Sequence, residues 1–155
     1  MSDVDVPHGA RVLPPAYFLI HLLAMAGLHF FLPIARWIPR PLGYLGILPA
    51  LAGVGLAIAA RTLFARQGTT IRPFEESSTL VVTGPYRLSR NPMYVGMTLV
   101  LVGEAVWFGT ATPWLLIPVF VWLITTHFIR HEEAMLEQRF GAQYREYKSR
   151  VRRWV

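Results

Sequence analysis

The sequence predicts an all-α integral-membrane protein, a helical bundle with about four transmembrane helices that forms one domain over residues 1–155. Composition is the first observation behind this prediction. Hydrophobic residues make up 54% of the chain and charged residues 15%, against about 25% charged in an average soluble domain. The second is that the apolar residues fall in four long runs, giving a mean hydropathy of +0.40. A chain of 155 residues cannot bury so much apolar surface in a water-soluble core.

The first two apolar runs, residues 15–34 and 42–60, contain no formal charge. At about 1.5 Å per residue, each run crosses a hydrocarbon layer of roughly 30 Å as a helix. Between them, residues 36–41 combine two arginines with two prolines, which predicts a short turn outside the hydrocarbon. The second run also contains four glycines, at which another helix can approach closely.

Residues 61–91 form the longest polar stretch, and we expect this connector to lie outside the bilayer core. The third apolar run, residues 93–108, is interrupted only by Glu104. An acid within a span costs about 2.5–3.5 kcal/mol on insertion scales. Glu104 is therefore expected to be protonated, to have an interhelical hydrogen-bond partner, or to face a substrate channel.

The fourth run, residues 114–129, predicts a helical hairpin with the third. Residues 109–113 form the predicted turn, with Thr112 capping the start of the following helix. Beyond the apolar run, the helix is expected to continue as a polar C-terminal helix to about Phe140, where Gly141 ends it.

Four spans place both termini on one side of the membrane, together with the connector. That side then carries thirteen cations, Arg11, Arg61, Arg66, Arg72, Arg87, Arg90, Arg130, Arg139, Arg145, Lys148, Arg150, Arg152 and Arg153. The opposite side carries two, Arg36 and Arg40. Because Lys and Arg near span ends favour the cytoplasm, both termini are predicted to be cytoplasmic, in the inner membrane if the protein is bacterial.

Several other classes of protein are disfavoured. The chain has no cysteine, which excludes disulfides, a thiolate nucleophile and cysteine-bound metals. His127 and His131 have helical i,i+4 spacing, but they lack a further ligand set, so we predict no metal site. The net charge of +6 is distributed between the apolar runs, which predicts contact with anionic membrane lipids rather than nucleic acid, above all at residues 150–153. Trp154 is expected to anchor the chain at the membrane interface.

Two polar segments, residues 83–96 and 130–147, are predicted to meet at the cytoplasmic surface. Arg90 and Asn91 come just before the third span, where the unpaired N–H groups of a helix start favour anions. Glu132 and Glu133 lie where the fourth helix leaves the membrane, and their carboxylates are suited to an ammonium or sulfonium cation. Together these segments predict a site for a zwitterionic ligand.

The same segments carry two motifs, GPYRxxRxPxY from Gly84 to Tyr94 and EExxLxxxFGxxYxxY from Glu132 to Tyr147. Over roughly residues 84–154, the chain resembles the superfamily of isoprenylcysteine carboxyl methyltransferases and phospholipid methyltransferases. The resemblance implies an integral-membrane enzyme that transfers a methyl group from S-adenosylmethionine to a lipophilic or small apolar acceptor entering from the bilayer. It also implies that the cofactor lies at the cytosolic ends of the last helices.

The resemblance implies roles for individual residues. Glu132 and Glu133 are expected to hold the methionyl ammonium of the cofactor, and Arg90 its carboxylate. Tyr94, Tyr144 and Tyr147 would stack on the adenine or line the sulfonium. The full set of expected cofactor-binding residues is Gly84, Tyr86, Arg90, Asn91, Pro92, Tyr94, Glu132, Glu133, Tyr144 and Tyr147.

The atom that accepts the methyl group decides which catalytic residues are needed. A carboxylate needs no base, whereas an amine or thiol must lose a proton, for which His131 and Glu104 are candidates. With Arg90, these two form the expected set of catalytic residues. Asn91 stands where the family often has histidine, and an amide cannot titrate near neutrality. We expect O- or S-methylation; the alternatives are phospholipid N-methylation and a non-catalytic membrane protein of the same fold.

Overall fold

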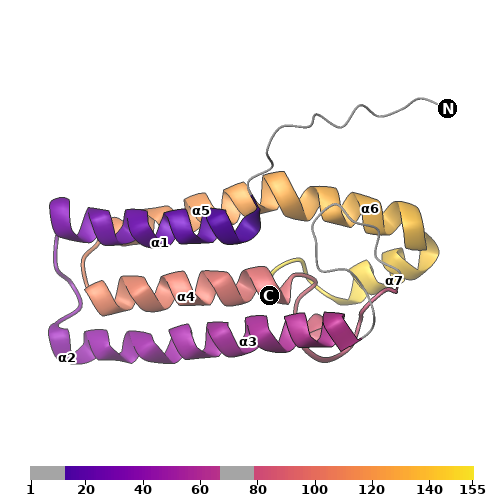
Figure 1. Ribbon diagram of the computed structural model, residues 1–155, viewed down its shortest axis with the longest axis horizontal. Helices are drawn as coiled ribbons and strands as arrows, with labels where there is room; N and C mark the ends of the chain where they lie inside the picture. Colours follow the sequence, from indigo (N-terminus) through magenta and orange to yellow (C-terminus); the bar gives the residue numbers. More distant parts are fainter. Residues whose placement is uncertain (1–12, 67–78) are drawn as a thin grey trace.

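The computed structural model describes residues 13–66 and 79–155, and its regular elements over these ranges are helices. Figure 1 shows α1, α3, α4 and α5 running side by side as a bundle, with α6 and α7 beyond one end. The helices are α1 (Pro14–Phe31), α2 (Arg40–Gly43), α3 (Ile47–Arg66), α4 (Pro92–Phe108), α5 (Leu116–Ile124), α6 (Arg130–Phe140) and α7 (Ala142–Arg150). The predicted all-α bundle is confirmed, and α3 extends further into the connector than the apolar run indicates.

Three helical segments are long and apolar enough to cross a membrane, namely Pro14–Phe31, Arg40–Arg66 and Thr112–Phe140. The fourth, α4, has 17 residues, which rise about 26 Å against a hydrocarbon thickness of about 30 Å. It is also the central helix, because it packs against α1, α3 and α5. Protein neighbours on three sides therefore shield α4 from lipid, which makes its shorter length and its acidic residue tolerable.

Glycines bring α3 and α4 into close contact. A methyl group added at Gly96 would lie 2.5 Å from the backbone oxygen of Gly53, and one at Gly103 would lie 2.5 Å from that of Gly46. No side chain other than hydrogen fits at such distances, so the two backbones pack directly against each other. Gly55 faces open space instead. The predicted close approach therefore holds for Gly43, Gly46 and Gly53 but not for Gly55.

The two turns at the far end of the bundle contact each other. The backbone N–H groups of Trp37 and Ile38 donate to the Gly109 oxygen at 3.0 and 3.2 Å. Gly109 ends α4 with φ +70°, which favours glycine. Thr112 was predicted to cap the next helix, and this is wrong. Its hydroxyl donates to the Leu32 oxygen at 2.7 Å, because that carbonyl lies beyond the last turn of α1 and needs a partner.

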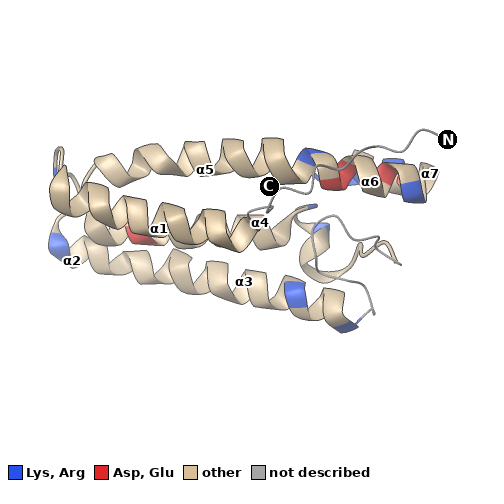
Figure 2. Cartoon of the chain, turned by 45° about the horizontal axis from the view of Figure 1, so that its top comes forward, with Lys and Arg blue, Asp and Glu red and all other residues tan. Residues whose placement is uncertain are grey.

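The fourth apolar segment continues into α6 through a π-helical turn, η4 (Thr125–Ile129). We treat residues 112–129 as its membrane-spanning part, since α6 is polar. Figure 2 shows charged residues gathered on α6 and α7. Helix α6 ends at Phe140 as predicted, followed by Gly141 with φ +51°. Helix α6 continues in the direction of α5, which places it at the same end of the bundle as the start of α4 (Figure 1).

The orientation of the bundle in the membrane can be tested by labelling, because the chain has no native cysteine. Single cysteines at the exposed positions Ser149 in α7 and Trp37 in the opposite turn report the two ends. The charge distribution predicts that an impermeant maleimide added to intact cells labels Trp37→Cys and leaves Ser149→Cys unlabelled until the cells are opened. The reverse pattern would contradict cytoplasmic placement of α6 and α7. Of the counted cations, Arg11 and Arg72 lie outside the described residues.

Candidate functional site

A cavity of about 80 Å³ lies where the start of α4 meets α6 and α7. Nine of the ten residues predicted to bind a cofactor line it: Tyr86, Arg90, Asn91, Pro92, Tyr94, Glu132, Glu133, Tyr144 and Tyr147. The remaining walls are mainly apolar and include Phe64 of α3 and Leu136 of α6. The structure therefore brings the two motifs together, although more than 35 residues separate Tyr94 from Glu132 in the sequence.

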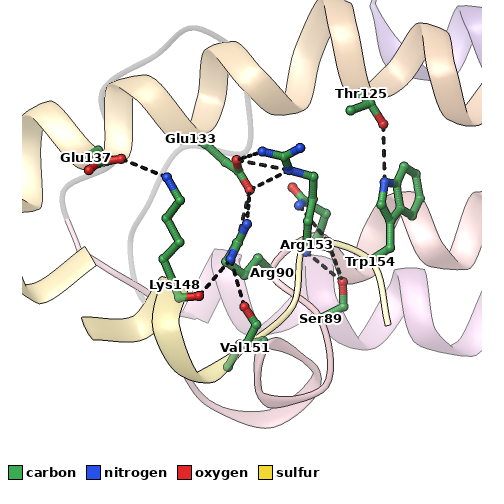
Figure 3. Close-up of polar contacts among 10 residues, drawn as sticks. Ser89, Arg90, Thr125, Glu133, Glu137, Lys148, Val151, Arg153 and Trp154 are labelled. Carbon is green, nitrogen blue, oxygen red and sulfur yellow. Dashed lines mark hydrogen bonds and ion pairs between the residues drawn. The ribbon is translucent and has the colours of Figure 1, made fainter. Parts of the chain in front are cut away.

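Glu133 forms the centre of an ion-pair cluster (Figure 3). Its Oε1 accepts from Nε and Nη2 of Arg90 at 3.1 and 2.8 Å. Its Oε2 accepts from Nε and Nη2 of Arg153 at 3.1 and 2.6 Å. Burial opposes ionisation of the Glu133 carboxyl, but the hydrogen bonds from Arg153 and Arg90 outweigh it and hold the pKa of Glu133 below its ordinary value. Glu133 is therefore an ionised carboxylate shared by two guanidinium groups.

Arg90 is held along both edges of its guanidinium. Nη1 donates to the backbone oxygens of Lys148 and Val151 at 3.1 and 2.8 Å, and the Nε–Nη2 edge points to Glu133. A guanidinium has five N–H groups, so these bonds leave one on Nη2. Arg90 was expected to bind the carboxylate of a ligand. In this state, Glu133 occupies the edge of Arg90 that is suited to a carboxylate.

Glu132 differs from its neighbour in the sequence. The Tyr94 hydroxyl donates to Glu132 Oε1 at 2.8 Å, and within the described residues Glu132 makes no ion pair. Burial raises the pKa of Glu132, although the hydrogen bond from Tyr94 opposes the rise. Glu132 is thus an acid on the cavity wall that the Tyr94 hydroxyl holds in place.

Two tyrosine hydroxyls of the cavity lack partners. The hydroxyl oxygens of Tyr86 and Tyr144 are buried and make no hydrogen bond with other described residues. In contrast, Tyr147 donates to the Tyr86 backbone oxygen at 2.7 Å. Burial raises the pKa of both Tyr86 and Tyr144, and it raises that of Tyr147 to about 12, so all three remain neutral at physiological pH. Unpaired buried hydroxyls are costly, and a bound polar ligand would satisfy them.

The C-terminal strap, which we define as residues 151–154, crosses the start of α4 (Figure 3). Ser89 Oγ and Asn91 Nδ2 both donate to the Arg153 backbone oxygen, at 3.1 and 3.0 Å. The Asn91 side chain therefore holds the strap in place. This role needs only a hydrogen-bond donor and no group that titrates. At the other end of the strap, Trp154 Nε1 donates to Thr125 Oγ1 at 3.3 Å and its ring packs on the bundle core. Trp154 is thus tied to the π-helical turn, and its interfacial role stays a prediction.

Three candidate residues lie elsewhere. Glu104 is twelve residues after the start of α4, about 18 Å along the helix axis. Its buried Oε2 has no hydrogen-bond partner among the described residues. His131 is exposed on α6, on a different side of the helix from the cavity. Gly84 does not line the cavity either; with φ +58° it shapes the turn η2 (Gly84–Arg87) that carries Tyr86. The structure thus does not place Glu104 or His131 at the site.

Arg153 is the site residue that the sequence did not reveal. It was predicted to contact lipid headgroups, but its side chain is paired with Glu133. The pairing joins residues twenty positions apart, across α6, Gly141 and α7. Neither motif includes Arg153, and helical periodicity does not extend through the break at Gly141.

One family model and several curated proteins match the chain. The sequence model of a family described as phospholipid methyltransferase matches residues 42–143. A Haemophilus influenzae protein, described as uncharacterized, is 40% identical over 63 residues, which are 41% of this chain and all of that protein. Protein-S-isoprenylcysteine O-methyltransferase A of Arabidopsis thaliana is 38% identical over 78 residues, which are 50% of this chain but 40% of the plant protein. Form B of the plant protein is 38% identical over 77 residues, or 39% of its length. No solved structure matches the chain.

Proposed function

Because this chain belongs to the phospholipid methyltransferase family, we propose that it is an integral-membrane enzyme that transfers a methyl group from S-adenosylmethionine to a lipophilic acceptor. The observation that carries the proposal is the pairing of Glu132 with Tyr94 on a cavity that also contains Arg90. An acid without an ion-pair partner among the described residues, next to a buried guanidinium, matches an amino-acid zwitterion.

The chemistry of the cavity walls fits the proposed cofactor. Glu132 would bind the ammonium of the methionyl group and Arg90 its carboxylate. The unpaired hydroxyls of Tyr86 and Tyr144 would supply hydrogen bonds to the nucleoside. Bound in this way, S-adenosylmethionine would supply an electrophilic methyl group. Tyrosine ring faces along the cavity would favour the positive sulfonium.

The volume of the cavity adds a structural requirement. About 80 Å³ is well below the roughly 300–1,000 Å³ of pockets that enclose small molecules. The described state is therefore closed, and the walls must separate before a nucleoside enters. The ion pairs of Arg90 and the contacts of the strap are the bonds at the polar end of the cavity that such opening would change.

The contribution of the protein to methyl transfer would be mainly geometric. Correct alignment of two reactants can supply about 7–11 kcal/mol of the barrier reduction. Among the described residues that line the cavity there is no histidine, and Glu104 lies near the other end of α4. A carboxylate acceptor is already ionised at neutral pH, so it suits this site better than an amine or thiol, which must lose a proton.

The acceptor is therefore proposed to be a carboxylate on an apolar molecule, in line with the names of the plant relatives. Transfer to the amine of a phospholipid is the second candidate, and the description of the family favours it. In both cases the acceptor would reach the cavity from the bilayer, since the apolar half of α4 leads to it.

The test is to incubate the purified protein with methyl-labelled S-adenosylmethionine and a membrane lipid extract, and to identify the labelled product by mass spectrometry. A methyl ester releases its label as methanol in base, whereas a methylated amine keeps it. We expect base-labile label in the lipid fraction. Binding of the cofactor without transfer to any extracted lipid would favour the non-catalytic alternative.

A further inference from the structure

The ion-pair cluster contains more positive than negative charge. Arg90 and Arg153 share the single carboxylate of Glu133, with closest distances of 2.8 and 2.6 Å. The side chains of Arg90 and Glu133 are only 8% and 7% exposed, whereas that of Arg153 is 34% exposed. The cluster therefore has one cation beyond what Glu133 neutralises, and a second anion would balance it.

The two arginines hold Glu133 in different ways. Arg90 contacts only Oε1 of Glu133, through its Nε–Nη2 edge. Arg153 contacts both oxygens, since its Nε lies 3.2 Å from Oε1 and 3.1 Å from Oε2 while Nη2 lies 2.6 Å from Oε2. Arg153 alone is thus sufficient to keep the carboxylate of Glu133 paired.

Arg90 would also stay in place without Glu133. Its Nη1 remains bound to the backbone oxygens of Lys148 and Val151, and its backbone N–H donates to the Arg152 oxygen at 2.9 Å. Release of Glu133 would leave Nε and both N–H groups of Nη2 facing outward in the fork that binds a carboxylate through two parallel hydrogen bonds.

We propose that Arg153 is a positioning residue that retains Glu133 when the carboxylate of a ligand takes its place on the Nε–Nη2 edge of Arg90. This inference rests on the proposed function and adds to it a residue outside both motifs. Without Arg153, Arg90 and Glu133 form a closed and neutral pair. A ligand carboxylate would then have to leave Glu133 buried without a counter-ion, which is strongly unfavourable.

The inference separates ligands that carry a carboxylate from those that do not. The probes are S-adenosylhomocysteine and its decarboxylated form, which keeps the amine and the nucleoside. For Arg153→Gln, we expect affinity for S-adenosylhomocysteine to fall about tenfold or more, as for loss of a charge-assisted hydrogen bond. Affinity for the decarboxylated form should not change. Arg145→Gln, which removes a cation from the exposed face of α7, is the matched control and should leave both affinities unchanged.

Each outcome of the titrations has a defined meaning. If Arg153→Gln lost affinity equally for both ligands, Arg153 would only maintain the fold. If it lost affinity for neither, Arg90 would bind the ligand carboxylate without help from Arg153. Both results overturn the inference. Equal affinity of the unmodified protein for the two ligands would overturn it as well, because Arg90 would then make no contact with the carboxylate. If the unmodified protein bound neither ligand, the proposed function would fail first and this inference with it.

Discussion

Replacing Glu132 with glutamine is expected to weaken the binding of S-adenosylhomocysteine by about 1.5–3 kcal/mol, the range for a hydrogen bond to a charged group. This is a loss of roughly tenfold to more than a hundredfold. Glutamine keeps the size of the side chain and can still accept the hydrogen bond from Tyr94, so the change removes mainly the negative charge. Calorimetric titration of the protein in detergent measures the effect.

Glu137→Gln is the matched control for this variant. Glu137 lies five residues further along α6 and pairs with Lys148 at 3.1 Å, with both side chains more than a third exposed. Exposed ion pairs contribute little free energy, so neither binding nor stability should change appreciably. Equal weakening by Glu132→Gln and Glu137→Gln would mean that general charge on α6, rather than a specific acid, attracts the ligand.

The pH dependence of ligand affinity provides a second test of the role of Glu132. Burial raises the pKa of Glu132, and only the ionised form pairs with an ammonium. Affinity should therefore be complete above this raised pKa and fall as the pH decreases through it. In Glu132→Gln, that fall should disappear. A fall of equal size in the variant would assign the titration to another group.

Replacing Gly53 with alanine should be the most damaging single methyl addition within α3. The new Cβ would overlap the backbone oxygen of Gly96 and lie 2.9 Å from Cβ of Leu99. Because backbone cannot move aside as a side chain can, the helices must separate, at a cost of about 1–3 kcal/mol for overpacking. Thermal unfolding in detergent should show a lower Tm.

Gly55→Ala is the control, since it makes the same substitution two residues later. It tests whether the loss of stability depends on where the methyl group is added or only on replacing a glycine. A methyl group there meets no atom within 4 Å. Alanine also has the higher helix propensity, by about 1 kcal/mol, so the Tm should stay the same or rise. If both variants lowered the Tm equally, the close contact between α3 and α4 would not be the reason.

The helices of the bundle could be predicted from the sequence because each one depends on residues that are close together in the chain. Each apolar run predicts one membrane-spanning helix, and Gly141 predicts the end of α6. The meeting of the two motifs was also predictable, since four spans bring Tyr94 and Glu132 to the same membrane surface. The hydrogen bond between these two side chains agrees with that prediction.

The roles of individual site residues were harder to predict from the sequence, because they depend on which residue each charged side chain contacts in the fold. Glu132 and Glu133 are adjacent and chemically identical, yet one is paired with two arginines and the other with a tyrosine. The position of Glu104 along α4 and the exposure of His131 remove both from the cavity. The sequence gives the residue type of a proton-transfer candidate but not its helix face or depth, which decide whether it lines the cavity.

The π-helical turn at Thr125–Ile129 sets the rotation of everything that follows it. Such a turn holds one residue more than a regular α-helical turn, and each residue advances a helix by about 100°. Deleting one residue there would leave both motifs intact while turning Glu132 and Glu133 together away from Tyr94. A homologue that lacks this extra residue would still be recognised as a relative by its sequence, although its acids would point in another direction.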